Sequence, residues 1–406
     1  MCIISDGGSH MENYYGKMEK TLVNKNISYM NLDEESSFKM GEPNRLIDTF
    51  CSKLESSKKD KKKYTTIELF AGAGGLALGV EKAGFNTIGL IEVDKDAADS
   101  LKENRPNWNV INEDIANISC LNLEDYFNIE NGQLDLLSGG APCQAFSYAG
   151  KRLGLEDARG TLFYHYATFL QKLQPKMFLF ENVKGLLTHD KGRTYETITD
   201  IFKQAGYTIQ KKVLNAWNFD VPQKRERLII IGIRNDLVDK VVFNFPKEHK
   251  YKPVLRDILL DCPKGPGTPY GENKRKIFEL VPPGGYWKDI DPKIAKEYMK
   301  SCWNMQGGRT GILRRMSLDE PSLTVLTSPS QKQTERCHPL EARPFTVREN
   351  ARCQTFPDDW EFCGNVSAQY KQVGNAVPVN LAYDIAKEIV HSLDMLEVNQ
   401  KVKEAM

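Results

Sequence analysis

The chain has 406 residues, 40% of them hydrophobic and 27% charged, and its 55 lysines and arginines against 54 acidic residues leave a formal net charge of +1. This length suits two or three domains, and an aromatic content of 10% without excess glycine or proline excludes a disordered, collagen-like or coiled-coil chain. No run approaches the ~18 apolar residues of a membrane span, and no signal peptide is recognisable, so we expect a cytoplasmic protein. The near-zero charge argues against a nucleic-acid partner unless basic residues gather locally.

The first 63 residues precede any clear periodic pattern. Residues 7–11 resemble an expression tag, so we interpret 1–11 as tag-derived and 12–63 as a polar extension that ends in the lysine-rich stretch 58–63. A solvated segment and a basic arm that touches phosphates both fit this composition. The nine cysteines are scattered without a CxxC pair, which predicts reduced thiols and neither a disulfide framework nor a metal site.

Five continuous apolar runs predict strands that are buried on both faces, because neither face of such a strand carries polar residues. A predicted helix follows the first run, and another, with Leu162, Tyr166, Phe169 and Leu173 on one face, lies between the third and fourth. Strands that alternate with helices are typical of a parallel α/β sheet covered on both sides. The runs are 65–70, 87–93, 134–138, 177–180 and 228–233.

The pattern changes after Arg234. Proline and glycine cluster at 263–269 and 282–285 and clear periodicity stops, so we predict a smaller second domain over about 241–345. A helical face returns in Leu381, Ile385 and Ile389. We therefore expect 346–395 to rejoin the first domain, 64–240, and 396–406 to form a tail.

A glycine-rich turn follows the first predicted strand. Gly72, Gly74 and Gly75 would let a ligand approach the backbone at a helix N-terminus, and Glu92, 20 residues after Gly72, can accept hydrogen bonds from ribose hydroxyls. This pattern predicts a cofactor that contains a nucleoside. Asp114, in the polar stretch 112–114, fits either an acceptor for an adenine amino group or a surface turn.

Three further motifs carry reactive side chains at strand ends. Cys143 lies in a loop directly after the run 134–138, where open α/β sheets keep their active sites. Glu181 follows the neighbouring run, so both should meet at one sheet edge, where the carboxyl group could hand a proton to a substrate as the sulfur attacks. Arg225 and Arg227 precede the last strand, and we expect them to point the same way and to hold a carboxylate and a substrate carbonyl.

These motifs, in this order, resemble the C5-cytosine DNA methyltransferase family. Residues 70–75 are similar to its cofactor loop, 142–144 to its nucleophile motif, 181–183 to its acid motif and 223–227 to its arginine motif. The resemblance continues in 343–352, 354–357 and 370–378 and covers about 64–390. It implies an α/β fold, with a Rossmann-like S-adenosylmethionine-dependent methyltransferase sheet carrying helices on both faces and a smaller, irregular target-recognition domain.

The resemblance also implies a mechanism. Cys143 would add to C6 of cytosine, Glu181 would engage N3 and the exocyclic amine, Arg227 would hold the O2 carbonyl and Arg225 would orient Glu181. The cofactor would be S-adenosyl-L-methionine and its product S-adenosyl-L-homocysteine. By the same resemblance the cofactor pocket comprises Phe70, Ala71, Gly72, Gly74, Gly75, Leu76, Glu92, Val93, Asp114, Ile115, Pro142, Leu162, Asn375, Ala376 and Val377.

The implied partner is double-stranded DNA with the target cytosine flipped out of the helix. The setting implied is a bacterial restriction-modification system, with a monomeric enzyme at the nucleoid and a cognate restriction endonuclease that acts separately. Sequence choice would fall to the stretch 328–336, since Arg and Gln side chains suit the edges of guanine and adenine. The expected DNA-binding residues are Gln144, Ser147, Lys151, Arg152, Ser330, Gln331, Gln333 and Arg336.

Three other functions are compatible with parts of the pattern. A dinucleotide-dependent oxidoreductase would use the glycine loop and Glu92 but leave Cys143 without a purpose. A silent DNA-binding regulator should lack one of the reactive groups, and none is missing. A transfer-RNA cytosine-5 methyltransferase of the same fold is the nearest alternative, although that branch typically has Pro-Pro-Cys-Gln where Ala141 precedes Pro142 here.

The net charge of the whole chain argues against a nucleic-acid partner, but basic residues are concentrated in two stretches. Residues 211–234 carry six lysines and arginines against two acids, and 296–315 carry five against one. We expect both stretches to face the DNA cleft, so binding should depend on salt.

Overall fold

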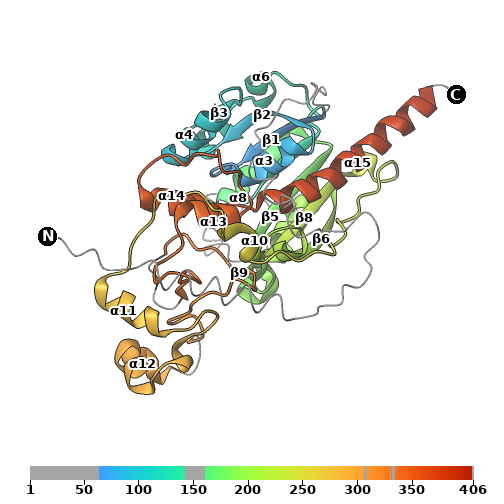
Figure 1. The fold of residues 1–406 in the computed structure, drawn as a ribbon. Coiled ribbons are helices and arrows are strands. Elements are labelled where there is room, and N and C mark those ends of the chain that lie inside the picture. The colour runs from blue at the N-terminus through green and yellow to red at the C-terminus, as the bar shows by residue number, and fades with distance from the viewer. Residues whose placement is uncertain (1–63, 142–160, 306–308, 330, 332–333, 405–406) are drawn as a thin grey trace, which may run out of the picture. The chain divides into compact units, whose positions relative to one another are not determined.

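The computed structural model describes residues 64–141, 161–305, 309–329, 331 and 334–404, all within one compact unit. A seven-stranded sheet in the order β3-β2-β1-β4-β5-β8-β6 lies at its centre (Figure 1). The strands are β1 (Tyr64–Leu69), β2 (Phe85–Ile91), β3 (Val110–Ile111), β4 (Leu136–Gly139), β5 (Met177–Val183), β6 (Tyr207–Asn215) and β8 (Glu226–Arg234). All five predicted strands are therefore present.

One strand runs against the others, which corrects the expectation of a wholly parallel sheet. β1, β2, β3, β4 and β5 pair in parallel, whereas β8 is antiparallel to both β5 and β6. The beginning of β8 therefore lies at the edge where the parallel strands end. Arg227, opposite Val183 in this register, reaches the active-site edge because of that reversal.

The edge strand β6 escaped the sequence analysis. Its central residues are exposed, and Lys211 and Lys212 interrupt any apolar run. A strand paired on only one side needs no continuous apolar sequence, so periodicity gives little signal for it.

Helices cover both faces of the sheet (Figure 1). On one face α8 packs a cluster of aromatic rings, including Tyr166 and Phe169, against the strands. On the other face α3 and the C-terminal helix α15 pack against each other and against the strands. The helices of this part are α3 (Gly75–Lys82), α4 (Lys95–Asn104), α5 (Ile115–Ser119), α6 (Leu123–Phe127), α8 (Leu162–Leu173), α9 (Arg193–Gln204), α13 (Val347–Cys353), α14 (Val366–Asn375) and α15 (Val379–Glu404).

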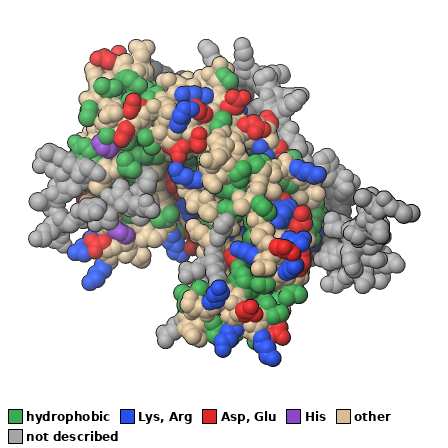
Figure 2. Space-filling view, turned by 90° about the vertical axis from the view of Figure 1, so that its left-hand side faces the viewer, with side chains coloured by type: hydrophobic (Ala, Val, Ile, Leu, Met, Phe, Trp, Pro, Cys, Tyr) green, Lys and Arg blue, Asp and Glu red, His purple; other side chains and the backbone are tan. Residues whose placement is uncertain are grey.

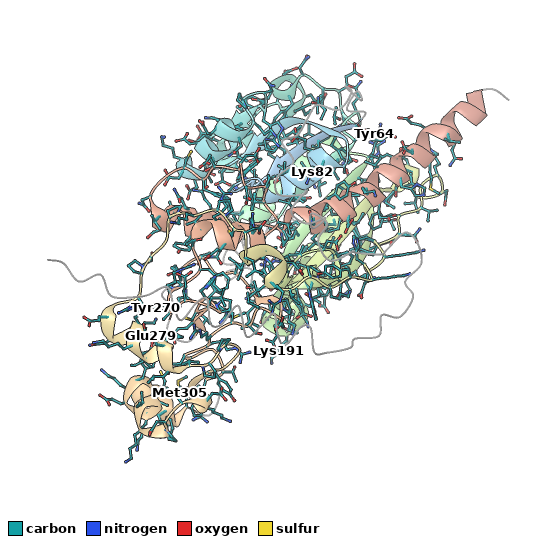
Figure 3. All side chains as sticks on the ribbon, in the orientation of Figure 1. Tyr64, Lys82, Lys191, Tyr270, Glu279 and Met305 are labelled. Carbon is teal, nitrogen blue, oxygen red and sulfur yellow. The ribbon has the colours of Figure 1, made fainter. Side chains whose placement is uncertain are left out.

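The predicted second domain has its own small core. It contains α10 (Arg256–Leu259), α11 (Glu272–Leu280), α12 (Pro292–Met299) and β9 (Ser322–Leu323), which pairs with β7 (Gln223–Lys224). Phe278, Met299, Ile312, Leu313 and Cys337 form a separate buried cluster there. Figure 3 marks this part by Tyr270, Glu279 and Met305. The described part of this segment therefore contains regular helices, so it is less irregular than its proline and glycine content suggests.

The end of the chain rejoins the first domain, as the returning helical face predicts. Leu381, Ile385 and Ile389 of α15 are buried beside Val80 of α3, and the Tyr64 hydroxyl donates a hydrogen bond to Asp394 at 2.8 Å. The helix continues past residue 395, and Leu396 is buried. Residue 396 is therefore part of the core and does not begin a separate tail.

A histidine clamp fastens α15 to the rest of the domain. His249 Nδ1 lies 2.7 Å from Asp220 and its Nε2 lies 2.8 Å from Asp384 on α15. The hydrogen bonds to these two carboxylates raise the pKa of His249 from 6.5 to about 10. The protonated ring therefore stabilises the fold at neutral pH.

We expect His249→Gln to lower the free energy of unfolding by about 1–2 kcal/mol near pH 6, a value reduced for partial solvent exposure. The folded-state pKa is the higher one, so the contribution is complete below the unfolded pKa and is lost as pH rises towards about 10. Urea denaturation at pH 6 and pH 9.5 should show a difference that shrinks at the higher pH. An equal difference at both values would contradict a charged clamp.

Within the described residues, no helix is long and apolar enough to cross a membrane. The cysteines there, Cys120, Cys262, Cys302, Cys337, Cys353 and Cys363, are free thiols.

Candidate active site

The glycine turn after β1 forms a cradle at the N-terminus of α3. Phe70 and Gly72 have φ angles of 58° and 54°, in the left-handed region, and such a conformation at a residue other than glycine is typical of functional turns. A Cβ on Gly72 would meet nothing within 4 Å, so the backbone there is open to a ligand. The turn therefore offers backbone N–H groups and free space, as a nucleoside cofactor requires.

Glu92 holds this turn in place. Its side chain, 8% exposed, accepts hydrogen bonds from the backbone N–H of Gly72 and of Asp94, both at 2.7 Å. Burial raises the pKa of Glu92 above its usual value. Each oxygen accepts one such bond and retains a lone pair, so the carboxylate can also accept bonds from ribose hydroxyls.

The C-terminal segment that contains Ala376 and Val377 packs against α3 beside the glycine turn. A Cβ on Gly75 would come within 2.2 Å of the Val377 carbonyl oxygen and 3.2 Å of the Ala376 Cβ. Gly75 is therefore needed for close packing of α3 against this segment. Asn375, at the end of α14, is exposed beside it.

The other predicted cofactor residues lie at strand or helix ends along the same edge. Val93, the second residue after β2, is 67% exposed, which leaves an apolar surface available for a base. Asp114 caps α5 by accepting the Ala116 N–H at 2.8 Å, so it is a helix cap as well as a candidate acceptor. Ile115 is buried, and Leu162 begins α8 half-buried.

The strand that leads to the nucleophile loop lies beside the acid motif. β4 and β5 are parallel neighbours with Gly139 opposite Phe180, and the Asn182 side chain donates to the Ala141 carbonyl at 2.9 Å. A Cβ on Gly140 would lie 2.8 Å from Glu181 Oε2. The chain therefore passes next to Glu181 just before Pro142 and Cys143, which lie outside the described residues, as do Gln144, Ser147, Lys151 and Arg152.

Glu181 and Arg227 form an ion pair at this edge. Arg227 Nε lies 2.7 Å from Glu181 Oε1, with side-chain exposures of 13% and 14%. The pair is partly shielded from water, which strengthens the interaction. It presents a carboxylate and guanidinium N–H donors to the same space, where they can bind the amide-like edge of a pyrimidine.

Arg225 does not have the predicted position. We expected it to orient Glu181, but its NH2 donates to the carbonyls of Gly374 and Ala376 at 3.0 Å and its NH1 to Val325 at 3.3 Å. The side chain is 2% exposed, and burial lowers the pKa of Arg225 to about 9. β7 ends at Lys224 and β8 begins at Glu226, so Arg225 lies between two sheets and points into the protein.

Arg225 belongs to a buried polar cluster. Gln223 donates to Gln354 at 2.8 Å, Gln354 donates to the Ala376 carbonyl at 3.0 Å, and the Val325 N–H donates to Gln223 at 2.9 Å. The cluster fastens β9 and the cofactor wall to the start of β8. Arg225 is thus a positioning residue in this geometry, and Arg227 takes the contact with Glu181.

We expect Arg225→Lys to lower the free energy of unfolding by about 2–3 kcal/mol, because an ammonium group cannot reach three carbonyls in the guanidinium geometry. Chemical denaturation measures this difference. Arg256→Lys is the matched control, since the Arg256 side chain pairs with the exposed carboxylate of Asp319. Equal losses in both variants would show that the buried cluster is not responsible.

Glu68 was missed by the sequence analysis. It is fully buried in β1 under the glycine turn, where it accepts hydrogen bonds from the Ala77 N–H and, at 3.4 Å, from Ser138. Burial raises the pKa of Glu68 to about 8. Its signal in the sequence was an acid inside an apolar run that should be buried on both faces, which is a costly position unless the acid has a task.

The predicted base-reading residues are only partly within the described part of the chain. Gln331 is exposed and Arg336 is half-buried, whereas Ser330 and Gln333 lie outside the described residues. On the face drawn in Figure 2, lysine and arginine side chains are interspersed with acidic ones.

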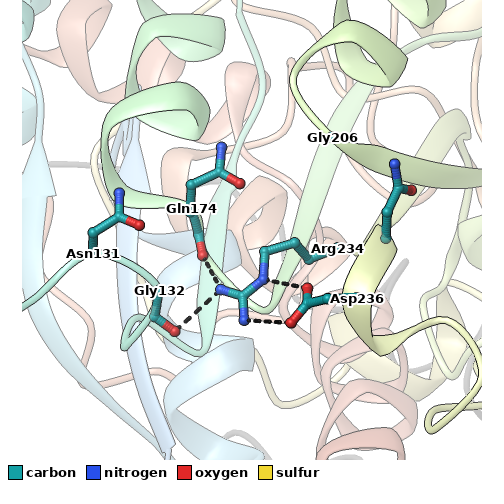
Figure 4. A pocket seen from close by; sticks show the side chains of 7 residues that line it. Asn131, Gly132, Gln174, Gly206, Arg234 and Asp236 are labelled. Atoms are coloured by element: carbon teal, nitrogen blue, oxygen red, sulfur yellow. Dashed lines mark hydrogen bonds and ion pairs between the residues drawn. The ribbon is translucent and has the colours of Figure 1, made fainter.

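The expectation that both basic stretches face the cleft also needs correction. Arg225 is buried, and Arg315 points inward and donates to carbonyls such as those of Pro339 and Val281. Arg234 lies at the opposite edge of the sheet, beside a hollow of about 390 Å³ (Figure 4). There it pairs with Asp236 and donates to the carbonyls of Gly132 and Gln174, so its donors are used structurally.

Comparisons with known proteins identify the family of the chain. The chain matches the family C-5 cytosine-specific DNA methylase over residues 64–391. It is 56% identical to the type II methyltransferase M.Sau96I of Staphylococcus aureus over 84% of this chain and 78% of that protein. It is 51% identical to M.Eco47II of Escherichia coli over 82% and 80% of the two chains.

Solved structures share the fold. A DNA modification methyltransferase encoded within an E. coli prophage superposes with a TM-score of 0.61 at 23% identity, covering 82% of this chain and all of the other. DNMT2 of Spodoptera frugiperda gives 0.57 at 18% identity, covering 81% and 100%. The chain therefore belongs to the C-5 cytosine-specific DNA methylase family and is a DNA cytosine-5 methyltransferase of the restriction-modification type.

Proposed function

We propose that this enzyme transfers the methyl group of S-adenosyl-L-methionine to C5 of a cytosine flipped out of duplex DNA, through a covalent bond between Cys143 and C6. The observation that carries the proposal is the Glu181–Arg227 ion pair beside the strand that leads to Cys143. A thiol, a carboxyl group and a guanidinium at one sheet edge are what addition to a pyrimidine ring requires.

The residues at the glycine turn fit the cofactor. The open backbone at Gly72, the Glu92 carboxylate and the exposed Val93 would hold the methionine, ribose and adenine parts respectively. When bound, S-adenosyl-L-methionine supplies an electrophilic methyl group and leaves as S-adenosyl-L-homocysteine. Asn375, Ala376 and Val377 would close the opposite side.

The protein's own groups would activate the base. The Cys143 thiolate forms a bond to C6 while Glu181 donates a proton to N3, so the ring electrons become available at C5. After methylation, loss of the C5 proton to a base restores the C5–C6 double bond and expels the thiolate from C6, and N3 returns its proton to Glu181. Arg227 would hold the O2 carbonyl and keep Glu181 in place, because its guanidinium carries several N–H donors in a rigid fork.

Substrate binding should require base flipping, because stacking in a duplex hides C5 and C6. We further propose that the division into a catalytic part, 64–240 with 346–395, and a target-recognition part, 241–345, separates chemistry from sequence choice. We also propose that the enzyme acts as a monomer at the bacterial nucleoid and that a cognate restriction endonuclease acts separately.

Incubation with tritium-labelled S-adenosyl-L-methionine and duplex DNA tests the proposed function. Label should appear at C5 of cytosine in DNA, and bisulfite sequencing should locate it at one recognition sequence. Transfer RNA serves as the competing substrate in a parallel reaction. Label in transfer RNA and not in DNA would overturn the proposal.

A further inference from the structure

Two arginines of the second domain lie side by side with the same charge. Arg315 and Cys337 form a parallel bridge, and the Cys337 N–H donates to the Arg314 carbonyl at 3.0 Å. Arg314 precedes Arg315, and Arg336 precedes Cys337. The side chains of Arg314 and Arg336 are therefore neighbours on the face opposite to that of Arg315 and Cys337. Like charges at such cross-strand positions destabilise a fold.

The surroundings do not neutralise this pair. Among the described residues, the acidic partner of Arg314 is the exposed Glu320, at 3.9 Å, and Arg336 NH1 donates to the Glu335 carbonyl. The Glu335 carboxylate itself points away, towards Lys274 at 2.7 Å. Within the described residues, the Nε of both Arg314 and Arg336 is buried without a hydrogen-bond partner.

The environment of the pair also suits a polar, anionic ligand. Burial and the neighbouring Arg314 lower the pKa of Arg336 to about 10. The Arg314 guanidinium lies 5.7 Å from the centre of the Tyr286 ring, and Arg309 lies 5.3 Å from that of Trp287. Cationic groups over aromatic rings are common where proteins bind nucleic acids.

We propose that Arg314 and Arg336 together form a DNA-contact site that binds acceptor oxygens or nitrogens of the duplex. The proposal rests on the proposed function, and it adds Arg314, which the sequence pattern did not single out. Guanine O6 and N7 and backbone phosphate oxygens share the required acceptor chemistry. Either would relieve the repulsion between the two guanidinium groups.

The variants Arg314→Gln and Arg336→Gln test the pair, and Arg275→Gln on α11 is the control, since Arg275 pairs only weakly with Glu279 at 3.5 Å. Each variant of the pair should lose about tenfold or more in DNA affinity, measured by fluorescence anisotropy. The melting temperature should stay the same or rise, because a like charge is removed. A purely structural role would instead lower it.

The competing duplexes identify the acceptor. If the variants lose affinity only for a duplex that the wild-type enzyme methylates, the acceptor is a guanine edge. If they lose affinity equally for an unrelated duplex, and binding becomes less dependent on salt, the acceptors are phosphates. Both outcomes support the site. Unchanged DNA affinity in both variants, or a loss that Arg275→Gln shares, overturns it. Wild-type protein that neither binds nor methylates DNA would instead refute the proposed function.

Discussion

Glu181→Gln should lower kcat by about 10²- to 10⁴-fold, because the amide cannot donate the proton that activates the ring. The ion pair with Arg227 would become a weaker neutral hydrogen bond, so the orientation of the side chain should also suffer. The affinity for S-adenosyl-L-methionine should stay within about twofold of wild type, since in the proposed mechanism Glu181 contacts the base and not the cofactor. Single-turnover methylation and calorimetric cofactor titration measure the two quantities.

Glu226→Gln is the matched control for this variant. Glu226 is next to Arg227 in sequence, but it is half-exposed and pairs with the exposed Lys184 at 3.0 Å. Its replacement should leave kcat nearly unchanged. A comparable decrease in kcat in both variants would mean that the negative charge near the beginning of β8, and not a proton from Glu181, is what the reaction requires.

Cys143→Ser should reduce methyl transfer by about 10³-fold or more, because a hydroxyl is far less nucleophilic than a thiolate at neutral pH. Duplex DNA with 5-fluorocytosine at the target position gives a second readout. Fluorine at C5 cannot leave as a proton does, so the Sγ–C6 bond should persist after methylation and survive denaturing electrophoresis. The wild-type chain should form this complex and Cys143→Ser should not.

Cys120→Ser controls for loss of a thiol as such. Cys120 is exposed at the end of α5, and its Sγ lies 3.2 Å from the Ala116 carbonyl oxygen. This variant should methylate DNA and form the trapped complex as wild type does. Trapping that persists in Cys143→Ser would show that another residue is the nucleophile.

The sequence by itself determined the strand–turn–helix unit around Gly72, and it predicts Cys143, Glu181 and Arg227 as the reactive groups. Continuous apolar runs specify buried strands, and glycines mark the turn, because these features depend on local conformation and burial. The positions of Cys143, Glu181 and Arg227 after or before such strands were enough to predict one shared sheet edge.

Only the tertiary structure decided which arginine serves the site. The reversal of β8 brings Arg227 to Glu181, whereas Arg225 lies between two sheets and bonds to carbonyls that are 100 to 151 residues away in sequence. Edge strand β6, the burial of Glu68 and the pairing of Arg314 with Arg336 were likewise not predicted from the sequence. Each depends on pairing between distant segments, and hydrophobic periodicity carries no information about which segments pair.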